Sequence, residues 1–186
     1  MILTGPVNLR HDPRFRAVPG NFRLALLYNV PVCERDESGR VHPSPEGVAV
    51  FRDLYGRRRR TAQLPEDLIS AELVQRAAQL SSGIVRDFLR ILHEACMNAL
   101  SAGGRSVSAE DLELSIKTLR LEMQGYLDQG HIDTLGRVLA KTTVPVTAQA
   151  DTLLFENFIA CYANGDLWYR PHELIVDFVE RHADRS

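Results

Sequence analysis

Arginines at two places in the chain could bind a phosphate group. Arg57 to Arg60 form an uninterrupted run, and Arg86 follows the small-residue stretch Ser81-Ser-Gly83, almost where a helix begins. A guanidinium group presents a planar set of donors that suits phosphate oxygens. Each arginine has an ordinary alternative: a run of charge is often a solvated segment, and Arg86 fits an exposed helix arginine paired with a neighbour. Spacing alone leaves both alternatives open.

Other residue patterns that could do chemistry are incomplete. A phosphate-cradling loop needs Gly-x-x-x-x-Gly-Lys-Ser/Thr, and Ala102-Gly-Gly-Arg-Ser106 has neither that spacing nor the lysine. The pair His93-Glu94 would need a second histidine at Met97 to build a metalloprotease site, so His93 is expected on a helix surface. No Ser/His/Asp or Cys/His set follows from spacing, which leaves a hydrolase weakly supported.

Composition sets the broad class of the protein. The chain has 186 residues, 45% of them hydrophobic, and a formal net charge of -2, so binding to nucleic acid would need a local basic patch. Three widely separated cysteines predict reduced thiols, and with no closely paired ligands no metal site is expected. We find no apolar run long enough for a membrane span and no signal-peptide pattern, which predicts a cytoplasmic protein that does not enter membranes.

Apolar spacing predicts mainly α structure with a few short strands. Short strands are expected at Met1–Thr4, Phe22–Val32 and Leu167–Tyr169, and a helix from Pro45 that stops at Gly56. Further helices are predicted at 65–80, 84–101, 108–127, 132–139, 153–162 and from Pro171, with a capping box at Ser108 to Asp111. Arg90 and Glu94 are expected to pair along their helix. Trp168 and Tyr169 could form the tip of a wing, although core packing is favoured for such large aromatics.

The order of these features resembles the C-terminal half of an AAA-type P-loop ATPase of the STAND-like or origin-recognition-like kind. Ile2-Leu-Thr4 with Gly5-Pro6 looks like the sensor-1 strand, and Ser81-Ser-Gly83 with Arg86-Asp87-Phe88-Leu89 looks like the start of a lid helix. The first glycine expected in that lid motif is serine here. Tyr162-Ala-Asn-Gly-Asp-Leu-Trp-Tyr169 is similar to the unit after the lid, which in some members is a winged helix.

That resemblance implies three parts and a role for each. Residues 1–60 would be a remnant of the ATPase core, 61–130 a helical lid-like bundle, and 131–186 a small winged-helix-like unit. It also implies that Thr4 and Arg86 contact nucleotide. The Walker A loop and Walker B acids would precede Met1, so the chain would be a truncated product, a separately encoded half, or a domain that has lost ATPase activity.

Two functions are therefore expected from the sequence. The first is a non-catalytic nucleotide-sensing lid and interaction module, which needs a P-loop ATPase core chain, or assembly as a homo-oligomer, for ATP hydrolysis and uses ATP with magnesium only in that setting. The alternative is a DNA-binding winged-helix protein in which Arg57, Arg58, Arg59 and Arg60 contact phosphates. The acidic residues near Arg170 weaken this alternative, because they repel the same phosphates.

Overall fold

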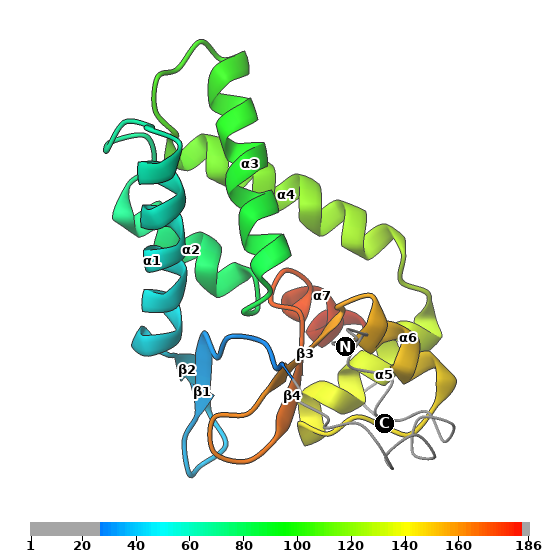
Figure 1. Cartoon of the computed structure of the whole chain (residues 1–186). Coiled ribbons are helices and arrows are strands. Elements are labelled where there is room, and N and C mark those ends of the chain that lie inside the picture. Colours follow the sequence, from blue (N-terminus) through cyan, green and yellow to red (C-terminus); the bar gives the residue numbers. More distant parts are fainter. Residues whose placement is uncertain (1–26, 184–186) are drawn as a thin grey trace, which may run out of the picture.

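The computed structural model describes residues 27–183, and this part of the chain is mainly helical, with two short antiparallel hairpins (Figure 1). The predicted fold class is thereby confirmed. Most of the helices and strands fall into two groups with their own apolar cores, and a small third cluster joins the two hairpins. We call helices α1 to α4 (residues 45–125) the helical bundle, and the group from α5 to α7 with the strands β3 and β4 (residues 129–182) the C-terminal unit.

The helical bundle consists of α1 (Pro45–Thr61), α2 (Ala71–Leu80), α3 (Val85–Ser101) and α4 (Ala109–Gly125). In α3 the buried residues recur every three or four positions, which puts them on one face: Phe88, Ile91, Leu92, Ala95 and Ala99. The opposite face of α3 is left to charged side chains. Helix α4 begins with the predicted capping box, in which Ser108 and Asp111 satisfy each other's backbone N–H groups.

Helix α1 is longer than the sequence predicts. The helix does not stop at Gly56 but continues through the arginine run to Thr61. A glycine inside a helix costs only about 1 kcal/mol relative to alanine, and arginine is a good helix former. The buried residues Val48 and Phe51 also anchor α1 in the core it shares with α2, α3 and α4. These contributions offset the cost of Gly56.

The C-terminal unit contains α5 (Gln129–Lys141), α6 (Ala148–Phe155), β3 (Ile159–Tyr162), β4 (Trp168–Pro171) and α7 (Val176–His182). Two predictions here are wrong. The helix expected over 153–162 ends at Phe155 and is followed by β3, and Pro171 ends β4 instead of opening the last helix. All four residues of β3 are buried, so the strand has no alternation of apolar and polar residues that would reveal it.

The hairpin β3–β4 is packed inside the molecule. Trp168 and Tyr169 are both buried, which confirms the preference for core packing over the tip of a wing. The indole Nε1–H of Trp168 donates to Asn164 at 2.9 Å, and the amide of Asn164 donates to the carbonyl of Cys33 at 3.0 Å. The hairpin turn is thus tied to the strand β1 (Cys33–Arg35), which pairs with β2 (Val41–Pro43).

Residues 27–32 lie between the two groups. No regular strand is present over these residues, so this part of the strand expected at Phe22–Val32 is wrong, and its first residues lie outside the described range. Asn29 exchanges hydrogen bonds with the backbone of Cys161 on β3, and the N–H of Val30 donates to the carbonyl of Gly83 at 3.1 Å. This connecting segment therefore bonds to both the bundle and the C-terminal unit.

The turn Ser81-Ser-Gly83, between α2 and α3, is buried and is where these parts meet. Ser82 and Gly83 both have positive φ, +52° and +75°. The hydroxyl of Tyr162 donates to the carbonyl of Ser82 at 2.9 Å, and the N–H of Glu173 donates to the Ser82 hydroxyl at 2.7 Å. The same turn that opens α3 therefore also holds the C-terminal unit.

Candidate functional site

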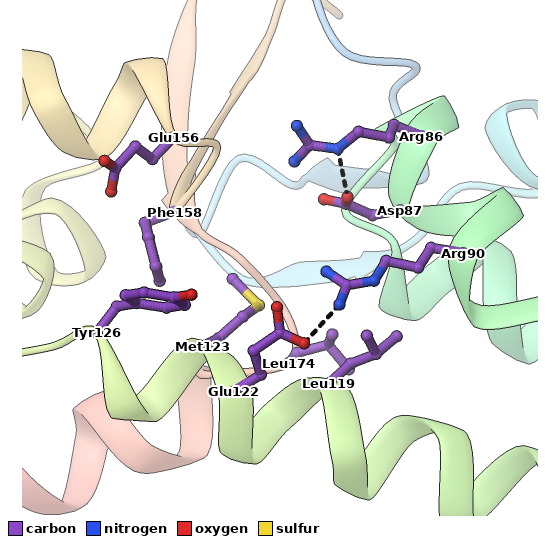
Figure 2. Close-up of a pocket in the computed structure, with 10 residues that line it drawn as sticks. All are labelled: Arg86, Asp87, Arg90, Leu119, Glu122, Met123, Tyr126, Glu156, Phe158 and Leu174. Atoms are coloured by element: carbon purple, nitrogen blue, oxygen red, sulfur yellow. Dashed lines mark hydrogen bonds and ion pairs between the residues drawn. The ribbon is translucent and has the colours of Figure 1, made fainter. Parts of the chain in front are cut away.

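A pocket of about 340 Å³ lies between the charged face of α3, the second half of α4 and the C-terminal unit (Figure 2). Three walls can be distinguished by the elements that supply them. The lining residues are Arg86, Asp87 and Arg90 from α3; Leu119, Glu122, Met123 and Tyr126 from α4 and its end; and Glu156, Phe158 and Leu174 from the C-terminal unit. Pockets of this size accept small organic ligands.

Arg86 is the second residue of α3 and points into this pocket. Its side chain is 68% exposed, and its Nε–H donates to Oδ1 of Asp87 at 3.0 Å. The structure thus contains the neighbour pairing that the sequence left open. That pairing uses only Nε: within residues 27–183 the two Nη groups have no hydrogen-bond partner, and Figure 2 shows them turned toward the open side of the pocket.

Asp87 connects Arg86 to a buried histidine. Its Oδ2 lies 3.4 Å from Nε2 of His172, which is fully buried in the turn after β4. This separation would make an ion pair only with a protonated imidazole, and the geometry does not make a hydrogen bond. Burial by itself raises the pKa of the Asp87 carboxyl; His172 and Arg86 outweigh it and hold that pKa below its ordinary value.

Replacement of Asp87 should therefore make the free energy of unfolding depend less on pH in the acidic range. We expect Asp87→Asn to lower the free energy of unfolding by about 1 kcal/mol or more at neutral pH, because the charge-assisted contacts to Arg86 and His172 are weakened. A lowered native pKa stabilises the fold above the ordinary carboxyl value of about 3.9, and that contribution is lost as pH falls through the native pKa. Urea unfolding from pH 7 to pH 3 measures this. A difference between wild type and variant that stays constant over this range would contradict the assignment.

Arg90 lies one turn after Arg86 on the same face of α3, but its predicted partner is wrong. The guanidinium pairs with Glu122 on α4, not with Glu94 on its own helix. A helix-surface pair at this spacing contributes only about 0.3–0.5 kcal/mol, so the packing of α4 against α3 decides the partner. Arg90 and Glu122 together close the α4 side of the pocket (Figure 2).

The remaining walls were not found from the sequence. Tyr126, just after the end of α4, is exposed, and Glu156 is exposed on the wall across from Arg86 (Figure 2). Within residues 27–183, Glu156 has no ion-pair partner. These residues are 30 positions apart in the chain and belong to no motif, so only the folded structure brings them together.

The other predicted residues lie away from the pocket or outside the described range. Arg57, Arg58 and Arg60 are exposed on the last turns of α1, whereas Arg59 is less exposed and lies 3.6 Å from Glu66. None of the four lines the pocket. Thr4, the predicted sensor-1 residue, lies outside the described residues, as does the strand predicted at Met1–Thr4.

Two further features bear on chemistry. His93 is exposed on α3, as predicted. Burial raises the pKa of the Cys33 thiol to about 11, so this thiol is protonated at neutral pH and is a poor nucleophile. Over residues 27–183 we find no group of three metal-binding side chains, and none of the helices there is both long and apolar enough to cross a bilayer.

Neither the protein-family models, nor the curated proteins, nor the solved structures give a match to this chain. The resemblance drawn from the lid-like and tail-like motifs thus stays a prediction.

Proposed function

We propose that the protein is a non-catalytic, nucleotide-sensing lid and interaction module that offers Arg86 to a phosphate group. The observation that carries this proposal is the position of Arg86: it stands at the start of α3, at the wall of a pocket, with two Nη groups directed into the opening. The first turn of a helix also carries a positive partial charge, which favours an anion there. Arg90, one turn further, lies on the same wall, where its charge is balanced by the ion pair with Glu122.

The rest of the pocket suits a ligand that is larger than a simple ion. Met123, Phe158 and Leu174 give it an apolar floor, and the exposed ring of Tyr126 offers a surface for stacking. A nucleotide has both a charged phosphate end and a flat apolar ring. Glu156 opposes a phosphate placed near it, so the anionic end belongs at Arg86, across the pocket.

Hydrolysis would require a second component. The sequence has no Gly-x-x-x-x-Gly-Lys-Ser/Thr loop, whose backbone and lysine hold the phosphates and whose hydroxyl binds magnesium. In the proposed assembly a P-loop chain binds ATP with magnesium, and Arg86 approaches the phosphates from the lid side. Alone, the chain is expected to bind ATP weakly: one or two charge-assisted hydrogen bonds correspond to a Kd on the order of 0.1–1 mM.

Calorimetric titration of ATP with magnesium into the purified chain tests this proposal. We expect Arg86→Ala to lose about tenfold or more in affinity, because it removes charge-assisted hydrogen bonds to phosphate. Glu156→Gln should bind about twofold to fivefold more tightly, since it removes a repelling carboxylate. Arg58→Ala is the matched control: it removes the same charge from an exposed arginine outside the pocket. No ATP binding at millimolar concentration, or equal losses in Arg86→Ala and Arg58→Ala, would contradict the proposal.

A second candidate function is DNA binding through α1. The observation that favours it is the exposure of Arg57, Arg58 and Arg60 together at the end of one helix. Three phosphate contacts give a slope of log affinity against log salt of about -2.7, at about -0.9 for each contact. Fluorescence anisotropy with a labelled duplex from 50 to 300 mM salt measures this slope, and the triple alanine variant should abolish it. Binding that is insensitive to salt, or absent at 50 mM salt, would exclude this candidate.

A further inference from the structure

A continuous set of contacts runs from the C-terminal unit to the pocket through His172. The N–H of Leu174 donates to Nδ1 of His172 at 3.2 Å, Nε2 of the same ring faces Oδ2 of Asp87 at 3.4 Å, and Oδ1 of Asp87 accepts the Nε–H of Arg86 at 3.0 Å. Leu174 is itself a wall of the pocket, and its carbonyl accepts a hydrogen bond from Arg120 of α4. Leu174 and Arg86, the two ends of this series of contacts, therefore both line the pocket.

The hydrogen bond to Leu174 fixes the orientation of the imidazole. Because Nδ1 accepts a backbone N–H, the neutral ring carries its proton on Nε2, the nitrogen that lies 3.4 Å from Oδ2 of Asp87. His172 is fully buried, and within residues 27–183 its Nε2 has no hydrogen-bond partner. A buried N–H without a hydrogen bond costs free energy, and electrostatic attraction to the Asp87 carboxylate, 3.4 Å away, offsets part of that cost.

We propose that His172 is a positioning residue for the phosphate site: it holds the Asp87 carboxylate, which in turn holds Arg86 with its Nη groups facing the pocket. Arg86 is long and mostly exposed, and without Asp87 it would lose its fixed orientation. His172 sits in the turn after β4, so docking of the C-terminal unit sets the orientation of Arg86. This inference rests on the proposed function for the role of Arg86, but the contact itself can be tested separately.

The coupling works in both directions. If docking of the C-terminal unit orients Arg86 for an anion, then an anion bound at Arg86 must favour the docked unit by the same free energy. Phosphate binding would then affect the β3–β4 hairpin and α7, which come before and after His172 in the chain. The lid would sense nucleotide through a contact of three side chains.

Two amide variants separate the two contacts of the ring. In His172→Gln the longer side chain brings an amide N–H to the place of Nε2, toward Asp87, whereas the shorter side chain of His172→Asn reaches only the place of Nδ1, toward Leu174. Both variants introduce an amide at the same buried position. They therefore differ chiefly in whether a donor faces Asp87. His93→Asn, at the exposed histidine of α3, is the control for a change remote from the pocket.

The first readout is the ¹⁵N-detected Arg86 Nε–H signal, assigned by its loss in Arg86→Lys. We expect His172→Asn to shift this signal and to speed its exchange with water, and His172→Gln and His93→Asn to leave it near its wild-type position. The second readout is the affinity for inorganic tripolyphosphate. It should fall about threefold to tenfold in His172→Asn and stay within about twofold of wild type in His172→Gln.

The outcomes of the two readouts are distinct. An unchanged Arg86 Nε–H signal in His172→Asn overturns the positioning role, whatever the affinities. If wild type binds no tripolyphosphate while the signal behaves as expected, the positioning contact stands and the proposed function fails. Should both amide variants unfold, the ¹⁵N shift of His172 Nε2 in the wild type and in Asp87→Asn decides: a shift that changes in Asp87→Asn supports the contact, and an unchanged shift overturns it.

Discussion

Gly83→Ala is expected to destabilise the fold by about 4 kcal/mol or more. Gly83 has φ of +75°, which side chains disfavour, and a Cβ atom there would lie 1.9 Å from the carbonyl oxygen of Val30. This obstacle is backbone, so no rotamer change relieves it. The connecting segment 27–32 must move away from the turn at 81–83, and the hydrogen bond from Val30 to Gly83 is lost with it. Chemical unfolding of the purified variant measures the loss.

Gly103→Ala separates the clash from the conformational strain. Gly103 has nearly the same φ, +74°, but, apart from its two neighbours in the chain, no atom of residues 27–183 lies within 4 Å of the position that its Cβ would take. It should cost only the left-handed penalty of about 1–2 kcal/mol. Equal losses for Gly83→Ala and Gly103→Ala would mean that the close approach of the Val30 carbonyl to Gly83 contributes nothing to the loss.

Phe88→Ala should lower stability by about 3–5 kcal/mol, as is usual when a buried phenylalanine is truncated. Phe88 is fully buried in the bundle, and its ring lies 4.7 Å, centroid to centroid, from that of Phe51 on α1. It also sits two residues after Arg86 on the opposite face of α3. The cavity would therefore loosen the start of α3 and weaken ATP binding, in addition to its effect on stability. Urea unfolding and the ATP titration measure these two effects.

Leu100→Ala on the same helix is the control for this substitution. Leu100 is mostly exposed, so its truncation should change stability by less than about 0.5 kcal/mol and leave ATP affinity unchanged. A similar loss in both variants would show that general helix stability, and not the Phe51–Phe88 contact, determines the result.

The helices of the bundle were predictable because one of their faces is buried and the other is not. The buried positions of α3 recur with helical spacing, and Ser108 and Asp111 match the sequence pattern of a capping box at the start of α4. The hairpin β3–β4 was only half predictable. Asn164-Gly165 marked its turn, but β3 is buried on both faces and reads like the end of the preceding helix. The end of α1 was missed because packing outweighed a local glycine.

The candidate site was predictable only at Arg86. Its position at the start of a helix could be read from Ser81-Ser-Gly83 and from the resemblance to a lid helix. The partners of the charged side chains on this face of α3 could not be predicted from the sequence. Arg90 meets Glu122 because α4 packs on α3, and Asp87 meets His172 across 85 positions of sequence because the C-terminal unit docks on the turn. Such pairs depend on tertiary structure, which short-range spacing does not contain.

The bonds of Asn29 to β3 also constrain the order in which the fold can be completed during synthesis. Asn29 and Cys161 are 132 residues apart, so these bonds cannot form until the chain as far as β3 has left the ribosome. Helices α3 and α4, by contrast, are neighbours in sequence and can pair as soon as both have been made. Closing the longer loop costs more chain entropy, and such distant contacts form slowly. The connecting segment must therefore remain without its hydrogen bonds to β3 until that strand has been made.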